Sequence, residues 1–384
     1  MRRIVLLSFL VTLAGAARLA ADEGRIPIFR STRITQPGHY VVTRDIAVSA
    51  GILLDIQADG VTIDLNGHTL SSSSAAEDVI QISGGGGTTK GIIINGGKGG
   101  GRIAGGMNGI HALPPGPCKL SIENLSIVDP NLRAILVEET GQVEIHGIIV
   151  NDRPSPTAGP LIDLRAPSTG PRGSAVISSI KLYDGPDTKG ISLSHVVGQL
   201  LDGVITVGPS STGGPGPAIN LADASGSSIR GFVINWSQEG GDPSINLVDS
   251  CGVLIAGNNL RGDGSVRTAT THHGIFVDAL SHNTFLMNNS ITGAGGDGIH
   301  VESLGNNLFG NMVGGNGGQG IFVAGDNNLI DGNKIANNLR SGLFFNTAGV
   351  PAHVFRNNLL RGNGAGGVGG PFGTAVTDAG GNVE

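Results

Sequence analysis

Histidine and carboxylate side chains gather in one part of the C-terminal half of the chain, and these residue types suit acid–base chemistry. His300 and Glu302 are two positions apart, which in a β-strand places both side chains on one face. Asp278 lies one repeat earlier, so stacked strands would bring it about 5 Å from Glu302. Two such carboxylates can transfer protons on a sugar or hold a divalent cation, with histidine as proton shuttle. These three residues, with His273 and Asp297 before the same strands, are our candidate catalytic residues.

Aromatic residues occupy equivalent positions around His300. Phe276, Phe322 and Phe344 can stack on sugar rings, and a groove along a repetitive fold suits a linear polymer. We add Asn346 to them as candidate substrate-binding residues. Two alternatives stay open, because the carboxylates can form a solvated polar ladder and the phenylalanines can be covered by the tail that contains Phe372.

The elements that must position these residues repeat along the chain. An apolar residue followed two positions later by another recurs every 22–30 residues, the range of repeat architectures. Gly or Asn recurs at a fixed place after a second short strand, as expected for a bend that needs a left-handed backbone. The apolar anchors are Ile52, Ile80, Ile110, Ile135, Ile162, Ile191, Ile219, Ile245, Ile275, Ile299, Ile321 and Leu343.

This period predicts an all-β solenoid. Each repeat has room for three short strands and no helix, and its strand edges can be paired only by the next repeat. A propeller would need antiparallel blades of about 40 residues, and a leucine-rich repeat would need its own leucine pattern. We therefore predict a parallel β-helix of about 12 coils with three short strands per coil, whose anchors point inward.

Composition and local sequence indicate how the rest of the chain is organised. Gly accounts for 66 of 384 residues, and 14% of the residues are charged. Residues 1–21 have the basic start, apolar centre and small residues of a secretory signal peptide, so we expect a secreted or periplasmic protein. We divide the rest into an N-terminal cap at 22–50, the β-helix at 51–362 and a Gly-rich tail at 363–384. No later segment is long and apolar enough to span a membrane.

Without residues 1–21 the chain has 21 basic and 30 acidic residues, a formal charge of −9. This charge argues against nucleic acid as a partner, because duplex binding depends on phosphate neutralisation. Cys118 and Cys251 are too few for a disulfide framework. The remaining histidines are spread over different coils, and we expect them at surface or turn positions; they include His111, His146, His195 and His353.

The sequence resembles the secreted right-handed β-helix proteins of the pectate-lyase-like superfamily. The resemblance covers about residues 38–362 and rests on GIHV, GIFV and NNLIDGN in the coils and on ITQPGHYVV and GVTIDLNGHTL near the start. It implies the right hand of the coil and, since polygalacturonases, alginate lyases and mannuronan epimerases share this fold, an activity on polysaccharides.

The catalytic motifs of those enzymes are not matched. The chain has no Asp-Asp pair and no Asp-Pro-His element, and THHG at 271–274 replaces the Gly-His-Gly element of polygalacturonases. Arg261, Arg267 and Arg340 are candidates for the base of a lyase. No catalytic residue is therefore carried over from the superfamily.

Three functional hypotheses follow. The leading one is a monomeric polysaccharide-active protein of lyase, epimerase or glycoside hydrolase type, acting in a groove on the first sheet. The second is a non-catalytic glycan-binding or structural β-helix protein. The third is a periplasmic metal-handling protein that uses His272, His273 and His300. No cofactor is certain; calcium is the candidate, because a charge of −9 disfavours polyuronates unless a cation bridges protein and polymer.

Overall fold

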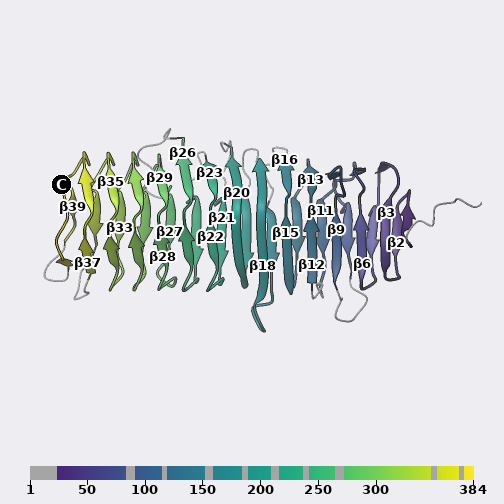
Figure 1. The fold of residues 1–384 in the computed structure, drawn as a ribbon, viewed down its shortest axis with the longest axis horizontal. Helices are drawn as coiled ribbons and strands as arrows, with labels where there is room; N and C mark the ends of the chain where they lie inside the picture. Colours follow the sequence, from purple (N-terminus) through teal and green to yellow (C-terminus); the bar gives the residue numbers. More distant parts are fainter. Residues whose placement is uncertain are drawn as a thin grey trace, which may run out of the picture.

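The chain folds into a rod of parallel β-strands stacked in chain order, and the first and last coils form its two ends (Figure 1). The computed structural model describes residues 24–83, 91–114, 119–151, 159–183, 189–208, 216–236, 242–263, 272–346, 353–371 and 376–384. The expected signal peptide, Cys118, Arg267 and Phe372 lie outside these residues. No helix in the described part of the chain has the length and hydropathy needed to cross a membrane.

One face of the rod is a 14-stranded parallel sheet with one strand from each coil. Its strands are short because each coil turns away after two to six residues. In spatial order they are β2 (Thr32–Ile34), β5 (Leu54–Ile56), β8 (Ile80–Ile82), β11 (Asn108–Ala112), β14 (Arg133–Val137), β17 (Pro160–Arg165), β19 (Lys189–Ser194), β21 (Ile219–Ala222), β24 (Ile245–Val248), β27 (Ile275–Val277), β30 (Ile299–Val301), β33 (Ile321–Val323), β36 (Leu343–Phe345) and β39 (Val368–Gly369).

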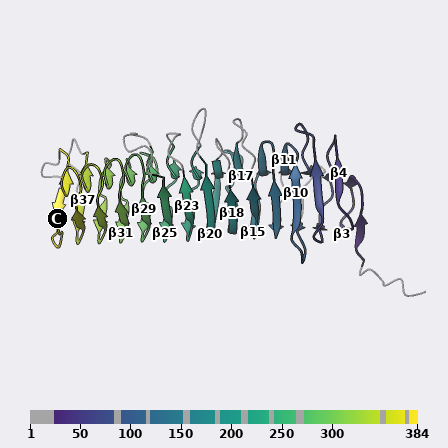
Figure 2. The ribbon, with the colours of Figure 1, turned by 90° about the horizontal axis from the view of Figure 1, so that it is seen from above.

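The other two faces form one 26-stranded sheet. Most coils have two separate strands here, but β18 and β20 run through the corner and pair with strands of both faces. Figure 2 shows the same stack of coils from above. The strands are β1 (Ile26–Ile28), β3 (Gly38–Val42), β4 (Ile46–Val48), β6 (Val61–Asp64), β7 (Thr69–Ser72), β9 (Ile92–Asn95), β10 (Gly101–Gly105), β12 (Lys119–Glu123), β13 (Leu125–Val128), β15 (Gln142–His146), β16 (Ile149–Asn151), β18 (Gly173–Tyr183), β20 (Val196–Val207), β22 (Ser228–Arg230), β23 (Val233–Trp236), β25 (Leu254–Ala256), β26 (Asn259–Gly262), β28 (Phe285–Met287), β29 (Ser290–Thr292), β31 (Asn307–Phe309), β32 (Met312–Gly314), β34 (Leu329–Asp331), β35 (Lys334–Ala336), β37 (His353–Arg356), β38 (Leu359–Arg361) and β40 (Val376–Asp378).

The predicted fold class, an all-β parallel solenoid, is confirmed, and eleven of the twelve anchors are in register. From Ile80 to Leu343 each anchor pairs with the next and is fully buried in one continuous aliphatic core. The first anchor is wrong, because Leu54 and not Ile52 pairs with Ile80. Ile52 is half-buried just before the strand.

The ends of the rod are also built from paired strands. In the segment that we expected to be a cap, β2 pairs with β5 and β3 pairs with β6. In the tail, β39 pairs with β36 and β40 pairs with β37. The parallel pairing therefore extends into both segments.

A column of glycines explains the repeated Gly before the anchors of the last coils. A Cβ on Gly298 would lie 2.8 Å from the Gly320 carbonyl oxygen, and a Cβ on Gly320 would lie 2.6 Å from the Gly342 carbonyl oxygen. Gly274 is equally confined by Gly298. These residues must lack a side chain because the next coil passes directly over them.

Buried asparagines join the last coils from within. Asn311 Nδ2 donates to the Leu286 carbonyl and to Asn333 Oδ1, and Asn311 Oδ1 accepts from the backbone and side-chain amides of Asn289. The same pattern links Asn333 to Asn358. Each asparagine thus satisfies polar groups of the coils before and after it, where an unpaired buried group would be costly.

We expect Asn311→Ala to lower the free energy of unfolding by about 2 kcal/mol, because it leaves two donors of Asn289 without an acceptor in the interior. The measurement is equilibrium unfolding in urea. Asn307→Ala, at a half-buried position on β31, is the control and should cost less than about 0.5 kcal/mol. Equal losses in the two variants would contradict a stabilising role for the ladder.

Candidate functional site

Four aromatic rings form a column along the outer face of the 14-stranded sheet. Phe276, His300, Phe322 and Phe344 are paired in register on consecutive strands, β27 to β36. The ring centroids are separated by 5.4, 4.2 and 5.6 Å, and the rings from His300 onward are stacked nearly parallel to one another. All four side chains are half-buried, so the column presents ring surface to solvent.

His300 lies between two carboxylates. Its Nδ1 donates to Asp297 Oδ2 at 2.8 Å, and its Nε2 lies 3.5 Å from Glu302 Oε1. Asp297 is largely buried, whereas 43% of the Glu302 side chain is exposed. The buried carboxylate thus orients the ring, and Nε2 and Glu302 are the members of the group that can exchange a proton with a bound molecule.

His273 and Asp297 also hold the coils together. His273 Nδ1 accepts from the Asp297 amide at 3.1 Å, and Asp297 Oδ1 accepts from the Gln319 amide at 2.6 Å. Gln319 Oε1 continues the pattern by accepting from the Ser341 amide. Each of these side chains precedes a glycine of the confined column and binds the coil that follows.

Burial, and then the nearby His300, lower the pKa of His273 to about 4. The His273 ring is 4.3 Å from the His300 ring and is shielded from water. A neutral His273 agrees with its Nδ1 accepting a hydrogen bond, and it places the ring proton on Nε2. His273 is therefore an uncharged structural partner at neutral pH.

This lowered pKa predicts a loss of stability in acid. The unfolded chain takes up a proton near pH 6.5 and the folded chain only near pH 4, so the free energy of unfolding should fall by about 3 kcal/mol across that window. His273→Asn keeps an acceptor and removes the titration, so its decline should be smaller by about that amount. Urea unfolding between pH 4 and 7 measures this, with exposed His146→Asn as the control. Identical declines in His273→Asn and wild type would contradict the assignment.

Two polar candidates remain, Asp278 and Asn346. Asp278 accepts hydrogen bonds from the Asp249 and Leu280 amides and from the Ser281 hydroxyl, so its carboxylate holds a turn. Asn346 is exposed just after β36. The two carboxylates in contact with His300 are Asp297 and Glu302.

Several buried polar residues were missed by sequence reasoning. His111 and His353, expected at surface or turn positions, are both buried. Asp163, on β17, is also buried and binds Arg133 and Arg165. His111 and Asp163 each follow an inward-pointing anchor of the 14-stranded sheet, so both occupy outward-facing positions. The repeat spacing already indicated these positions, and that was the signal that could have identified them.

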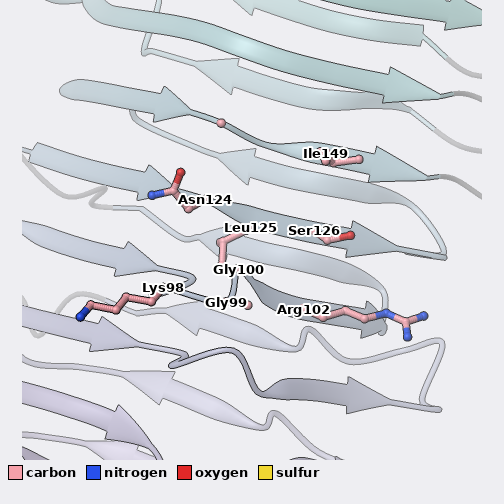
Figure 3. A pocket seen from close by; sticks show the side chains of 11 residues that line it. Lys98, Gly99, Gly100, Arg102, Asn124, Leu125, Ser126 and Ile149 are labelled. Atoms are coloured by element: carbon pink, nitrogen blue, oxygen red, sulfur yellow. The ribbon is translucent and has the colours of Figure 1, made fainter.

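An open groove of about 800 Å³ lies on the 26-stranded sheet. Its floor is the glycine-rich turn 96–101, and Figure 3 shows Lys98 and Arg102 at opposite ends of the turn, with Asn124 and Ile149 on the following coils. Its lining holds no carboxylate or histidine. The groove therefore lacks the acid–base groups of the column around His300.

Comparison with solved structures confirms the architecture. The A-module of Azotobacter vinelandii mannuronan C-5 epimerase AlgE6 is similar over 90% of this chain and 90% of its own, with 13% identity and a TM-score of 0.53. The A-module of mannuronan C-5 epimerase AlgE4 from the same organism covers 89% of this chain and 91% of its own, with 13% identity and a TM-score of 0.50. The chain is a right-handed parallel β-helix protein. These similarities concern the fold of the β-helix protein, and its activity depends on its own residues.

A comparison of sequences adds a family. Residues 175–365 of this β-helix protein match the family described as periplasmic copper-binding protein (NosD). A comparison with curated proteins finds no match. The word periplasmic in the family description agrees with the extracytoplasmic location that we predicted.

The matched region contains a group of suitable residue types for copper, namely His273, Asp297 and His300, whose potential ligand atoms lie within 4.8 Å of one another. Imidazole nitrogen is a ligand that copper prefers. In this structure, however, His273 Nδ1, both Asp297 oxygens and His300 Nδ1 are engaged in hydrogen bonds. These hydrogen bonds hold neighbouring coils together, and we route no step through a copper ion.

Proposed function

We propose that this protein binds a linear polysaccharide along the outer face of the 14-stranded sheet and acts on it beside His300. The observation that carries the proposal is the stacked column of Phe276, His300, Phe322 and Phe344, which offers aromatic surface on four consecutive coils with a histidine–carboxylate pair inside it. The coils are about 5 Å apart, so the column offers evenly spaced contacts along its length. Such a row of contacts suits a repeating polymer better than it suits a single small molecule.

The residues divide the work. The phenylalanine rings stack on sugar rings and exclude water. Glu302 and His300 Nε2 take up and deliver a proton at a sugar carbon or a glycosidic oxygen, the step that lyases, epimerases and hydrolases share. Asp297 holds the ring of His300 in place through Nδ1. The reaction type then depends on which sugar atom lies above Nε2.

The similar solved structures suggest the first polymer to test. Both are named as epimerases of mannuronan, a polyuronate, and both share the fold of this chain. A polyuronate would meet a negatively charged protein, so calcium belongs in the assay as a bridging cation. A neutral glucan is the comparison polymer that needs no such bridge.

Binding tests the aromatic column directly. We expect Phe322→Ala to weaken polysaccharide binding about fivefold, the equivalent of one stacking contact of about 1 kcal/mol. Phe309→Ala is the matched control, because Phe309 is an exposed phenylalanine of β31 on the other sheet. Affinity electrophoresis in gels with and without polymer measures both. Equal mobility shifts in the two variants would place binding elsewhere.

The second candidate function is polysaccharide binding without turnover. The observation in its favour is that His273, Asp297 and Asp278 all satisfy backbone amides and so have structural roles already. Binding that depends on Phe322 with no chemical change in any polymer would support this candidate over the first.

A further inference from the structure

A second histidine–carboxylate cluster lies at the other end of the 14-stranded sheet, around β8, β11 and β14. Asp78 and His111 are each more than nine-tenths buried. Asp78 Oδ2 accepts from His111 Nδ1 at 2.7 Å, and Asp78 Oδ1 accepts from the side-chain and backbone amides of Asn108. Asp78 thus accepts from three donors, and its bond to His111 places the ring proton on Nδ1.

The other nitrogen of His111 has no partner. Nε2 is shielded from solvent and makes no hydrogen bond, and Glu138 Oε1 lies 4.0 Å from it. With the proton on Nδ1, both atoms are acceptors and cannot bond to each other. A buried acceptor left unpaired costs about 1–3 kcal/mol of stability. A bound ion or molecule between His111 Nε2 and Glu138 Oε1 would remove this cost.

We propose that His111 Nε2 and Glu138 Oε1 bind a divalent transition-metal cation such as Zn²⁺. Bonds of about 2.0–2.2 Å in tetrahedral geometry require the two ligand atoms to be about 3.4 Å apart. A small rotation of the partly exposed Glu138 side chain, from its present 4.0 Å, would complete the pair. Asp78 on Nδ1 supplies the carboxylate–histidine arrangement that orients metal-binding imidazoles and raises their basicity. A nitrogen ligand favours zinc or copper over calcium and magnesium, which prefer oxygen.

Glu138 connects the proposed site to solvent. About one third of the Glu138 side chain is exposed, so water can complete the coordination from the solvent side. Arg165 of the next strand interacts electrostatically with Glu138, and its bonds to Asp163 offset its charge. The site lies before residue 175 and is therefore separate from the region that matches the copper-binding family.

Equilibrium dialysis against Zn²⁺ tests this site without reference to polysaccharide. We expect His111→Gln and Glu138→Gln each to bind one equivalent of Zn²⁺ fewer per chain than the wild type. His146→Gln, at an exposed histidine on β15, is the matched control and should keep the wild-type stoichiometry. Glu138→Gln changes a partly exposed side chain and keeps its shape, so it decides the question if His111→Gln fails to fold.

An ordered water is the alternative occupant. In that case Glu138→Gln and wild type would bind the same amount of Zn²⁺, and the proposal would be overturned. The same holds if the stoichiometry falls only in variants of His273 or His300. A thermal shift by Zn²⁺ that is present in wild type and lost in Glu138→Gln would support the site independently.

Discussion

Gly320→Ala should destabilise the protein by at least about 3 kcal/mol. The added methyl group would lie 2.2 Å from Ile335 Cγ2 and 2.6 Å from the Gly342 carbonyl oxygen. The first contact is with a core side chain and the second with backbone, so neither can move without disturbing the next coil, and overpacking of this kind is costly. Urea unfolding followed by circular dichroism measures the loss.

Gly99→Ala is the control for this prediction. Gly99 is exposed, and its nearest neighbour to an added Cβ is the Gly67 Cα at 3.3 Å. Its substitution should change the free energy of unfolding by less than about 0.5 kcal/mol. If Gly320→Ala proves as stable as Gly99→Ala, the close approach of the coils at the glycine column is wrong.

Glu302→Gln should lower polysaccharide turnover at least about 100-fold and leave binding unchanged. The amide keeps the size of the side chain and cannot exchange a proton with His300 Nε2, which lies 3.5 Å from the carboxylate. General acid–base groups contribute about 100- to 10,000-fold to rates. His300→Ala should lose as much turnover and also weaken binding, because its ring is stacked on Phe322.

The split between kcat and KM separates these two roles. Glu302→Gln should change kcat alone, whereas Phe322→Ala should act mainly on KM. Glu144→Gln, on β15 of the other sheet, is the carboxylate control and should have wild-type kinetics. Equal kcat values for wild type and Glu302→Gln would remove Glu302 from the chemistry.

The fold was predictable because one physical signal is repeated many times. The anchors from Ile80 onward are correct since every coil must bury the same position. The left-handed bends expected at the recurring Gly or Asn are present at Asn124, Asn288 and Asn357, among others. The error at Ile52 arises near the end of the repeat, where two apolar residues compete for one place. β18 is one continuous strand that pairs with strands of two faces of the rod. The sequence could not predict this, because it depends on the backbone conformation at the corner between the faces.

The arrangement of the site was less accessible to sequence reasoning. Strand alternation placed His300 and Glu302 on one face, and the structure brings them together. It could not show that Asp278 turns back to bind Ser281, since a side chain beyond a strand end is no longer directed by the pleat. Strand alternation also could not show that the buried His111 binds Asp78, because that contact joins residues 33 positions apart.

Mass spectrometry of polysaccharides after incubation in D₂O tests the central claim most directly. The protein would be incubated with mannuronan and with a neutral glucan, with and without calcium, beside the Glu302→Gln variant. The account predicts one of three changes with wild type alone: shorter chains, chains with unsaturated ends, or chains of unchanged length that carry non-exchangeable deuterium from epimerisation. Polymers left unchanged by the folded wild-type protein, or changed equally by Glu302→Gln, would contradict it.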